Sequence, residues 1–363
     1  MLKPVIVLVL SLGMPWATIS SADQGGLEYG QLSAELTGVP QNLLGLVHTP
    51  EVQSELKLED LQSQKFESEL RAIDSVWWPA RIQPVDQQRK IVAGLEAKLV
   101  EIVGRLGGKS AVERLRQIEL QSQSSRVVLR PEVSSYLRLD ATQNKKLKEL
   151  FAGTDELAKD LKPDDTKGAA QLAAAQQAEP SKALAILLPQ QIEKLRTAFG
   201  KPLDTTKLER IYPFAPELIE SEHWTSEKKA ELKSLQGKVV LVHFYAFQCH
   251  NCVANFGHYK RWHETLSKKG VELVGIQTPE TSAEREPEKV IAAARKEGFQ
   301  FPVLIDLESK NWKAWGNTMW PTVYVIDKKG YIRFWWQGEL NWQGATVDKR
   351  IEDIVEKLLS ENE

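Results

Sequence analysis

The residues best suited to chemistry in this 363-residue chain are its two cysteines, which form the motif Cys249-His250-Asn251-Cys252. Two cysteines three positions apart cannot build a framework of structural disulfides. A chain that has only such a close pair is better suited to thiol–disulfide exchange. We therefore predict a redox-active Cys249–Cys252 disulfide, with no other cofactor and no bound metal ion.

The elements around this motif predict different roles for the two thiols. Residues 238–245 form an apolar run suited to a buried strand, and the segment from Cys252 to about residue 268 has a helical pattern. Cys249 is therefore expected near a helix N-terminus, where unpaired N–H groups stabilise a thiolate. We expect Cys249 to attack a disulfide and Cys252, one helical turn later, to resolve the mixed disulfide.

The remainder of the C-terminal half alternates strand and helix patterns, which predicts a mixed sheet with flanking helices. Its last two strands flank a polar turn and are expected to form a hairpin. Trp320-Pro321 stands directly before the first of these two strands. The expected strands are 271–276, 322–326 and 331–336, and the expected helices are 288–297 and 345–359.

Residues from about 204 to 361 resemble the thioredoxin superfamily, in particular its exported TlpA-like and DipZ-like redoxin branch. This resemblance implies an α/β thioredoxin-like fold in which Pro321 is cis and faces the cysteine pair, so that the preceding backbone is free to pair with substrate. His250, Asn251 and Trp320 are then residues that tune the pair, and Asn251 is also the residue before the second cysteine in the DipZ-like branch. The matching residues are Trp224, Gly237, the run from Lys238 to Cys252, Thr278-Pro279-Glu280 and Trp320-Pro321.

His243 is the clearest departure from thioredoxin, which has a proton-handling Asp at the strand position six before its first cysteine. A histidine titrates near neutrality, so His243 could take a proton from Cys252 during resolution. Alternatively, it is a core histidine satisfied by a hydrogen bond, because burial opposes the charged form. Both interpretations stay open.

Metal delivery is the alternative function, because five of the six histidines fall between residues 223 and 263. His258 and His263 are five apart on the predicted helix, about 140° around it, and cannot easily converge with the cysteines on one ion. The alternative is thus a thioredoxin-fold copper delivery protein. A third class is a non-catalytic adaptor that binds partners through the N-terminal half.

The N-terminal half, residues 23–202, is expected to be an all-helical domain with an internal duplication, because residues 50–65 and 131–146 are identical at eight of sixteen positions. A Leu-x-x-x-Gln pattern recurs at 58–62, 139–143 and 187–191, and resembles the helical Leu-Thr-x-x-Gln repeats of some exported bacterial proteins. The polar insert 154–180 is expected to be mobile or a solvated helix. Trp77 and Trp78 are interpreted as packing residues, and the domain as a binding or spacing element.

The first 22 residues read as a secretory signal peptide: Lys3 is followed by an apolar run and then by Ser20, Ser21 and Ala22. The protein is therefore expected to be exported to the periplasm or another extracytoplasmic space, or to stay membrane-anchored if the segment is not cleaved. A net charge of -2 makes nucleic acid an unlikely partner. The predicted organisation is 1–22 signal peptide, 23–202 helical domain and 203–363 thioredoxin-like domain, exchanging disulfides with protein thiols and with a partner that supplies or accepts electrons.

Overall fold

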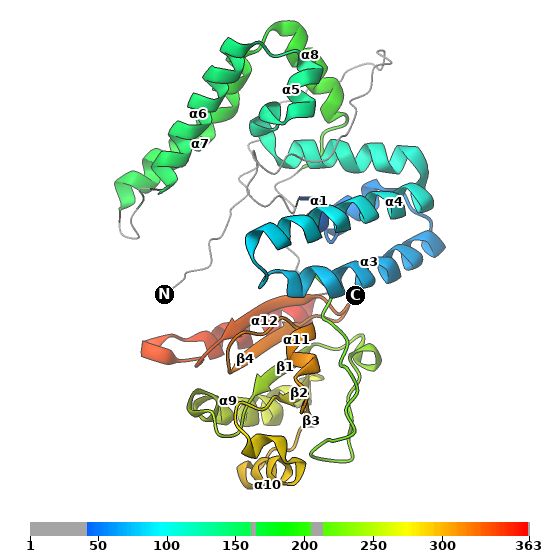
Figure 1. Cartoon of the computed structure of the whole chain (residues 1–363), viewed down its shortest axis with the longest axis vertical. Coiled ribbons are helices and arrows are strands. Elements are labelled where there is room, and N and C mark those ends of the chain that lie inside the picture. The colour runs from blue at the N-terminus through cyan, green and yellow to red at the C-terminus, as the bar shows by residue number, and fades with distance from the viewer. Residues whose placement is uncertain (1–41, 160, 162–164, 205–212, 362–363) are drawn as a thin grey trace. The chain divides into compact units, whose positions relative to one another are not determined.

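The computed structural model describes residues 42–159, 161, 165–204 and 213–361. The expected signal peptide lies outside these residues. The described chain divides into two compact units (Figure 1): a helical unit of residues 42–66 and 92–204, and a second unit of residues 67–91 and 213–361. This division differs from the single boundary expected near residue 202, because a segment of the N-terminal half packs into the second unit.

The second unit is built on a five-stranded mixed sheet in the order β3-β2-β1-β4-β5. The central strand β1 is parallel to β2, β2 is parallel to β3, and the antiparallel pair β4–β5 completes the other edge. This arrangement confirms the predicted thioredoxin-like fold. The strands are β1 Val240–Tyr245, β2 Glu272–Gln277, β3 Val303–Ile305, β4 Thr322–Ile326 and β5 Ile332–Gln337.

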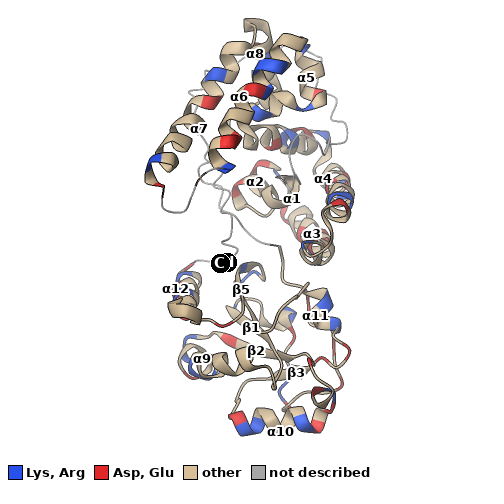
Figure 2. Ribbon diagram, turned by 60° about the vertical axis from the view of Figure 1, so that its left-hand side comes forward, with Lys and Arg blue, Asp and Glu red and all other residues tan. Residues whose placement is uncertain are grey.

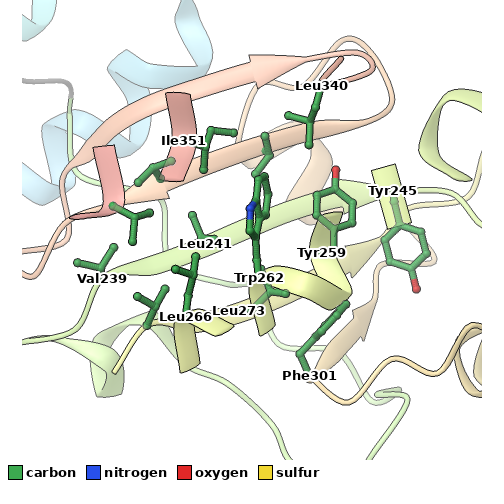
Figure 3. Close-up of a cluster of buried hydrophobic side chains, with 14 of the residues drawn as sticks. Val239, Leu241, Tyr245, Tyr259, Trp262, Leu266, Leu273, Phe301, Leu340 and Ile351 are labelled. Atoms are coloured by element: carbon green, nitrogen blue, oxygen red, sulfur yellow. The ribbon is translucent and has the colours of Figure 1, made fainter. Parts of the chain in front are cut away.

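Helices α9 and α12 supply the core on one face of this sheet (Figure 3). Side chains of β1 alternate between the two faces, so Leu241 and Tyr245 join Trp262 of α9 and Ile351 of α12 in one buried cluster. The unit's helices are α9 His250–Leu266, α10 Pro287–Glu297, α11 Lys310–Ala314 and α12 Val347–Ser360. Its short 3-10 helices are η3 Leu232–Leu235, η4 Ser267–Lys269, η5 Ala283–Arg285 and η6 Trp342–Gly344.

The opposite face of the sheet is covered in part by the C-terminal half of α3, Asp60–Ala80. Trp78 is buried among Val240, Val242, Phe244 and other apolar residues of that face. The guanidinium of Arg81 lies 3.7 Å from the centre of the Trp78 ring and donates hydrogen bonds to the carbonyl of Trp315 and the hydroxyl of Tyr324. Trp78 is therefore a packing residue, as the sequence predicts.

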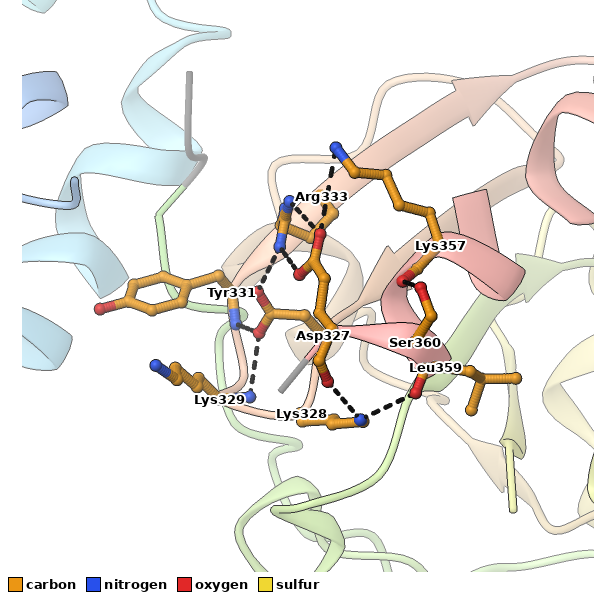
Figure 4. A network of polar contacts seen from close by, with 9 residues as sticks. Asp327, Lys328, Lys329, Tyr331, Arg333, Lys357, Leu359 and Ser360 are labelled. Carbon is orange, nitrogen blue, oxygen red and sulfur yellow. Dashed lines mark hydrogen bonds and ion pairs between the residues drawn. The ribbon is translucent and has the colours of Figure 1, made fainter. Parts of the chain in front are cut away.

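A polar network closes the β4–β5 hairpin against the end of α12 (Figure 4). Asp327 accepts hydrogen bonds from the backbone amides of Lys329 and Tyr331 with one oxygen, and pairs with Arg333 through the other. Arg333 also pairs with Glu361, which follows α12. The hairpin predicted from the polar turn is therefore tied to the last helix by buried and half-buried charges.

The helical unit confirms the all-α prediction for the N-terminal half. The long helix α4, Val85–Ser122, bends at Gly108, which has a φ of 73°. A left-handed φ interrupts the helical hydrogen-bond pattern and suits a glycine. The remaining elements are α1 Asn42–Leu46, α2 Pro50–Glu55, α4 Val85–Ser122, η1 Ser124–Leu129, α5 Pro131–Leu137, α6 Ala141–Lys159, α7 Thr166–Ile186 and α8 Pro189–Phe199.

The backbone repeats over the same 81-residue interval as the sequence. Lys57, two residues after α2, and Arg138, directly after α5, have positive φ values of 51° and 53°. The bend of α4 at Gly108 corresponds to Pro189, where α8 begins. In each copy a short helix and a turn are therefore followed by two long helical segments and a further helical segment.

The recurring glutamine of the Leu-x-x-x-Gln pattern caps helices. Oε1 of Gln62, Gln143 and Gln191 accepts the backbone N–H three residues earlier, at Glu59, Asp140 and Leu188. This is half of a capping box. In the second copy Asp140 completes it by accepting the Gln143 amide at 2.7 Å, as the spacing predicts.

The insert 154–180 is mostly helical and solvated, since it lies largely in α6 and in α7, whose first turn is capped by Asp165.

Figure 2 shows acidic and basic residues interspersed along α6, α8 and α10. No helix within the described ranges is long and apolar enough to cross a membrane.

Candidate functional site

The cysteine motif lies at the junction of β1 and α9. The apolar strand ends at Tyr245, and after a short turn Cys249 takes the N-cap position of α9, with extended φ and ψ of −72° and 117°. The carbonyl of Cys249 accepts the amides of Cys252 and Val253 at 3.0 and 3.1 Å. Cys249 is therefore at the helix N-terminus, where backbone dipoles favour an anion. Both cysteines are free thiols, and Cys249 is partly exposed whereas Cys252 is fully buried.

The two thiols differ in environment. Burial raises the pKa of Cys252, and the neighbouring Cys249 and Glu280 raise it further. The backbone amide of Ala246, 3.5 Å from the Cys252 sulfur, acts in the opposite direction. A buried thiol that resists ionisation suits a resolving cysteine, because it stays protonated until a mixed disulfide forms next to it.

The Trp320–Pro321 peptide bond is cis. The Trp320 ring stacks on Trp312 of α11 at a centroid distance of 4.0 Å, and its indole N–H donates to the carbonyl of Thr278 at 3.2 Å. The carbonyl of Pro321 accepts the amide of Gly338 at 2.8 Å. These contacts fix the cis peptide between α11, the end of β2 and the loop after β5.

A groove borders the motif on the side of the loop after β5. It is lined by Asn251, by the segment 336–339 and by Trp342, whose ring is largely exposed. Gly338 in this wall is the residue whose backbone N–H donates to the carbonyl of Pro321, so the wall of the groove contacts the cis peptide. Of the predicted tuning residues, Asn251 lines the groove, Trp320 holds the cis peptide and His250 is exposed on the first turn of α9.

His243 is buried in β1 on the face covered by α9. Its ring stacks on Tyr259 at a centroid distance of 4.0 Å. Within the described part of the chain neither ring nitrogen has a well-formed hydrogen bond. Burial lowers the pKa of His243 to about 3, against a smaller opposing effect of the Val274 backbone. The imidazole is therefore neutral at ordinary pH and packs against aromatic rings in the core.

Two further residues organise the site and are not evident from the sequence. Glu284 is fully buried, and its carboxylate accepts the backbone amides of Gln248, Glu280 and Thr281 at 2.7, 2.7 and 2.9 Å. Asn255 of α9 donates to the carbonyl of Gly338 at 3.2 Å and accepts the amide of Leu340 at 3.0 Å. The only sequence signal is proximity, since Glu284 follows the Thr278–Glu280 segment and Asn255 follows Cys252 by three residues.

The histidines that could have served a metal make other contacts. His258 lies 3.3 Å from Asp348 and 3.1 Å from Arg261, and His263 contacts the hydroxyl of Ser267 at 3.2 Å. Across residues 42–361, leaving out those not described, no three His, Cys, Asp or Glu side chains are placed to hold one ion.

Comparison with known proteins places this site in a family context. Residues 215–335 match the model of the AhpC/TSA family. Protein DipZ of Mycobacterium tuberculosis is 32% identical over 150 residues, 40% of this chain and 21% of DipZ. Thiol-disulfide oxidoreductase ResA of Bacillus anthracis is 31% identical over 29% of this chain and 58% of ResA. Thiol-disulfide oxidoreductase YkuV of Bacillus subtilis is 24% identical over 41% of this chain and 95% of YkuV.

The chain spans about a fifth of the length of the DipZ proteins that it matches. Residues 215–335 contain strands β1 to β4 and most of β5, the cysteine motif at the start of α9 and the cis peptide. The C-terminal part of this chain is therefore a redoxin domain with a thioredoxin-like fold, of the kind found in thiol–disulfide oxidoreductases.

Proposed function

We propose that the protein is an exported thiol–disulfide oxidoreductase that exchanges disulfides with partner proteins through Cys249 and Cys252. The observation that carries the proposal is the position of the two thiols: Cys249 is partly exposed at the N-terminus of α9, and Cys252 is buried one turn later. The names of two relatives, both thiol-disulfide oxidoreductases, support the same reaction.

The proposed reaction has two steps. The Cys249 thiolate attacks one sulfur of a partner disulfide, so that a mixed disulfide forms and the other partner sulfur leaves as a thiolate and takes up a proton. Cys252 then loses its proton and attacks the Cys249 sulfur, which releases the second partner thiol. Two electrons and two protons pass from the protein to its partner, and the pair ends as a Cys249–Cys252 disulfide.

Return to the dithiol requires a second partner that donates electrons, which by chemistry is another dithiol. The same steps run in reverse when the oxidised pair accepts electrons from a substrate dithiol. Substrate segments would lie across the groove lined by Asn251 and Trp342, next to the cis peptide. Pro321 has no N–H of its own, which leaves the neighbouring backbone for pairing with an extended segment.

Export is the part of the proposal that rests on the sequence alone. The order of Lys3, an apolar run and the small residues 20–22 supports secretion and cleavage before Asp23. Sequencing the N-terminus of the protein recovered from the extracytoplasmic fraction tests it. We expect a chain that starts near Asp23; a chain that remains in the cytoplasm would contradict export.

The exchange reaction is tested with full-length Cys252→Ala and Cys249→Ser. Cys252→Ala keeps the attacking thiol but cannot resolve, so we expect a partner to stay attached through a disulfide that dithiothreitol releases. Cys249→Ser should form no such adduct and should reduce insulin at least 100-fold more slowly than the wild type. Equal insulin reduction by the wild type and Cys249→Ser would refute the proposal.

A further inference from the structure

Glu284 stands out because it is a fully buried carboxylate placed beside the cysteine motif rather than in it. One of its oxygens accepts the amide of Gln248, and the other accepts the amides of Glu280 and Thr281. All three donors are backbone groups of loops, one loop before α9 and one after β2. Glu284 therefore connects two loops that are about thirty residues apart in sequence.

Burial of a carboxylate is costly unless it is well supplied with hydrogen bonds. Three bonds from backbone N–H groups to one carboxylate are charge-assisted and short, which makes them strong and directional. The arrangement therefore restrains the positions of the donors. A second contact ties the same loops, because the hydroxyl of Thr281 donates to the side-chain carbonyl of Gln248.

The restrained residues adjoin both thiols. Gln248 directly precedes Cys249, and the turn that contains them is closed by the Cys249 amide bonding to the carbonyl of Ala246 at 3.2 Å. The amide of Ala246 in turn contacts the Cys252 sulfur. A shift of this turn would therefore change the orientation of the Cys249 sulfur and the surroundings of Cys252 together.

The third restrained residue, Glu280, brings a negative charge to the pair. Its side chain is exposed, and its backbone is held on the same carboxylate as Gln248. The charge of Glu280 is one of the causes that raise the pKa of Cys252. Removal of that charge should therefore let Cys252 ionise at lower pH.

We infer that Glu284 is a positioning residue of the redox site: its carboxylate fixes the loop that presents Cys249 and holds Glu280 beside the cysteine pair. This inference rests on the proposed thiol–disulfide exchange. Glu284 takes no part in the bond changes. It sets the geometry in which Cys249 attacks and the electrostatic field in which Cys252 resolves.

The test uses full-length Glu284→Gln and Glu280→Gln, with Glu286→Gln as the matched control. Glu286 lies two residues from Glu284, is exposed and pairs with Lys289 at 2.8 Å. In Glu284→Gln the side-chain amide keeps the shape of the carboxylate, but it directs an NH2 group at one of the backbone N–H donors. Three quantities are measured with oxidised and reduced glutathione: the rate of attack in a Cys252→Ala background, the pH profile of resolution, and the equilibrium constant of the Cys249–Cys252 couple.

We expect Glu284→Gln to slow the attack at least tenfold and to change the equilibrium constant at least fivefold. Glu280→Gln should leave the attack within twofold of the wild type but move the resolution profile to lower pH. Glu286→Gln should match the wild type in all three. A Glu284→Gln protein that also matches the wild type overturns the inference.

Far-UV circular dichroism and a cooperative thermal transition verify that each variant folds. If Glu284→Gln does not fold, Thr281→Val decides, because it removes only the hydroxyl contact between the same loops; we expect a two- to fivefold slower attack, and an unchanged rate overturns the inference. A wild type that exchanges no disulfide with glutathione overturns the proposed function and this inference with it. An active wild type with an equally active Glu284→Gln overturns this inference alone.

Discussion

Gly275 stands opposite His243 in the parallel pairing of β1 with β2, and its missing side chain makes the space that the buried imidazole fills. A Cβ at position 275 would lie 3.1 Å from Cε1 of His243 and 2.9 Å from a methyl group of Val303. Both distances are shorter than ordinary contacts between carbon atoms. The presence of histidine in the centre of β1 thus depends on glycine in β2.

Gly275→Ala should therefore lower the free energy of unfolding by about 1–3 kcal/mol, the usual cost of overpacking a core. Urea unfolding, followed by the accessibility of Cys252 to alkylation, measures this in the second unit itself. The double variant His243→Ala/Gly275→Ala should show a smaller penalty for the added methyl group than the single variant does. Strict additivity of the two substitutions would contradict the pairing.

The neutral state of His243 has a consequence for acid stability. Its pKa is about 3 in the folded protein and about 6.5 in an unfolded chain, so the unfolded state binds more protons between these values. The contribution of His243 is fully present above about pH 6.5 and is lost as the pH falls towards 3. Through His243 the wild type should therefore lose about 2 kcal/mol of unfolding free energy between about pH 7 and about pH 5. His243→Leu should not show this loss.

Urea unfolding of the wild type and His243→Leu at both pH values provides this measurement. Val253→Ala, an exposed apolar substitution in the same unit, is the control and should keep the wild-type pH dependence. The same His243→Leu protein tests the proton-transfer hypothesis. Slower resolution of the mixed disulfide would support it, whereas unchanged exchange kinetics would refute it and leave the acid-stability effect intact.

Trp78 of α3 should stabilise the second unit as much as buried residues of the sheet do. Replacement by Ala removes a large buried ring that touches Tyr324 and Trp335, and should cost about 3–5 kcal/mol. Val76→Ala, two residues away on the exposed side of α3, should change stability by less than about 0.5 kcal/mol. Alkylation of Cys252 as a function of urea reports on this unit, and equal midpoints for the two variants would contradict the packing.

Gln143 and Gln62 allow a matched comparison of two copies of one motif. Each caps a helix, but Gln143 also exchanges hydrogen bonds with Gln191 and donates to the carbonyl of Ile186. Gln143→Ala should therefore cost about 2–3 kcal/mol, and Gln62→Ala about 0.5–1 kcal/mol. Far-UV circular dichroism in urea measures both, and a larger loss for Gln62→Ala would show that the glutamine pair contributes little.

Local patterns predicted the elements that carry the chemistry. The apolar run before Cys249, the helical segment after Cys252 and the polar turn at 327–330 are short-range signals, and the structure has β1, α9 and the β4–β5 hairpin at these places. The Asp140–Gln143 spacing likewise predicted a helix start. In each of these cases the interacting residues are close in sequence.

Local patterns do not predict contacts between segments that are far apart in the sequence. Residues 67–91 have an ordinary helical pattern, which indicates that one face is buried but not which strands bury it. The position of Glu284 depends on two loops meeting, and a single glutamate in a polar stretch resembles any solvated one. The sequence leaves the environment of His243 open for a similar reason, because its neighbours Tyr259 and Gly275 lie on other elements.

The division of α3 and α4 between the two units affects how the chain can fold during its synthesis. Residues 67–91 leave the ribosome long before β4 and β5, whose Tyr324 and Trp335 contact Trp78, have been made. Until then an indole and its apolar neighbours must be shielded in some other way, by transient packing or by a chaperone. The second unit is thus built from two separate stretches of the sequence, and a fragment that starts at residue 203 would lack part of the core of this unit.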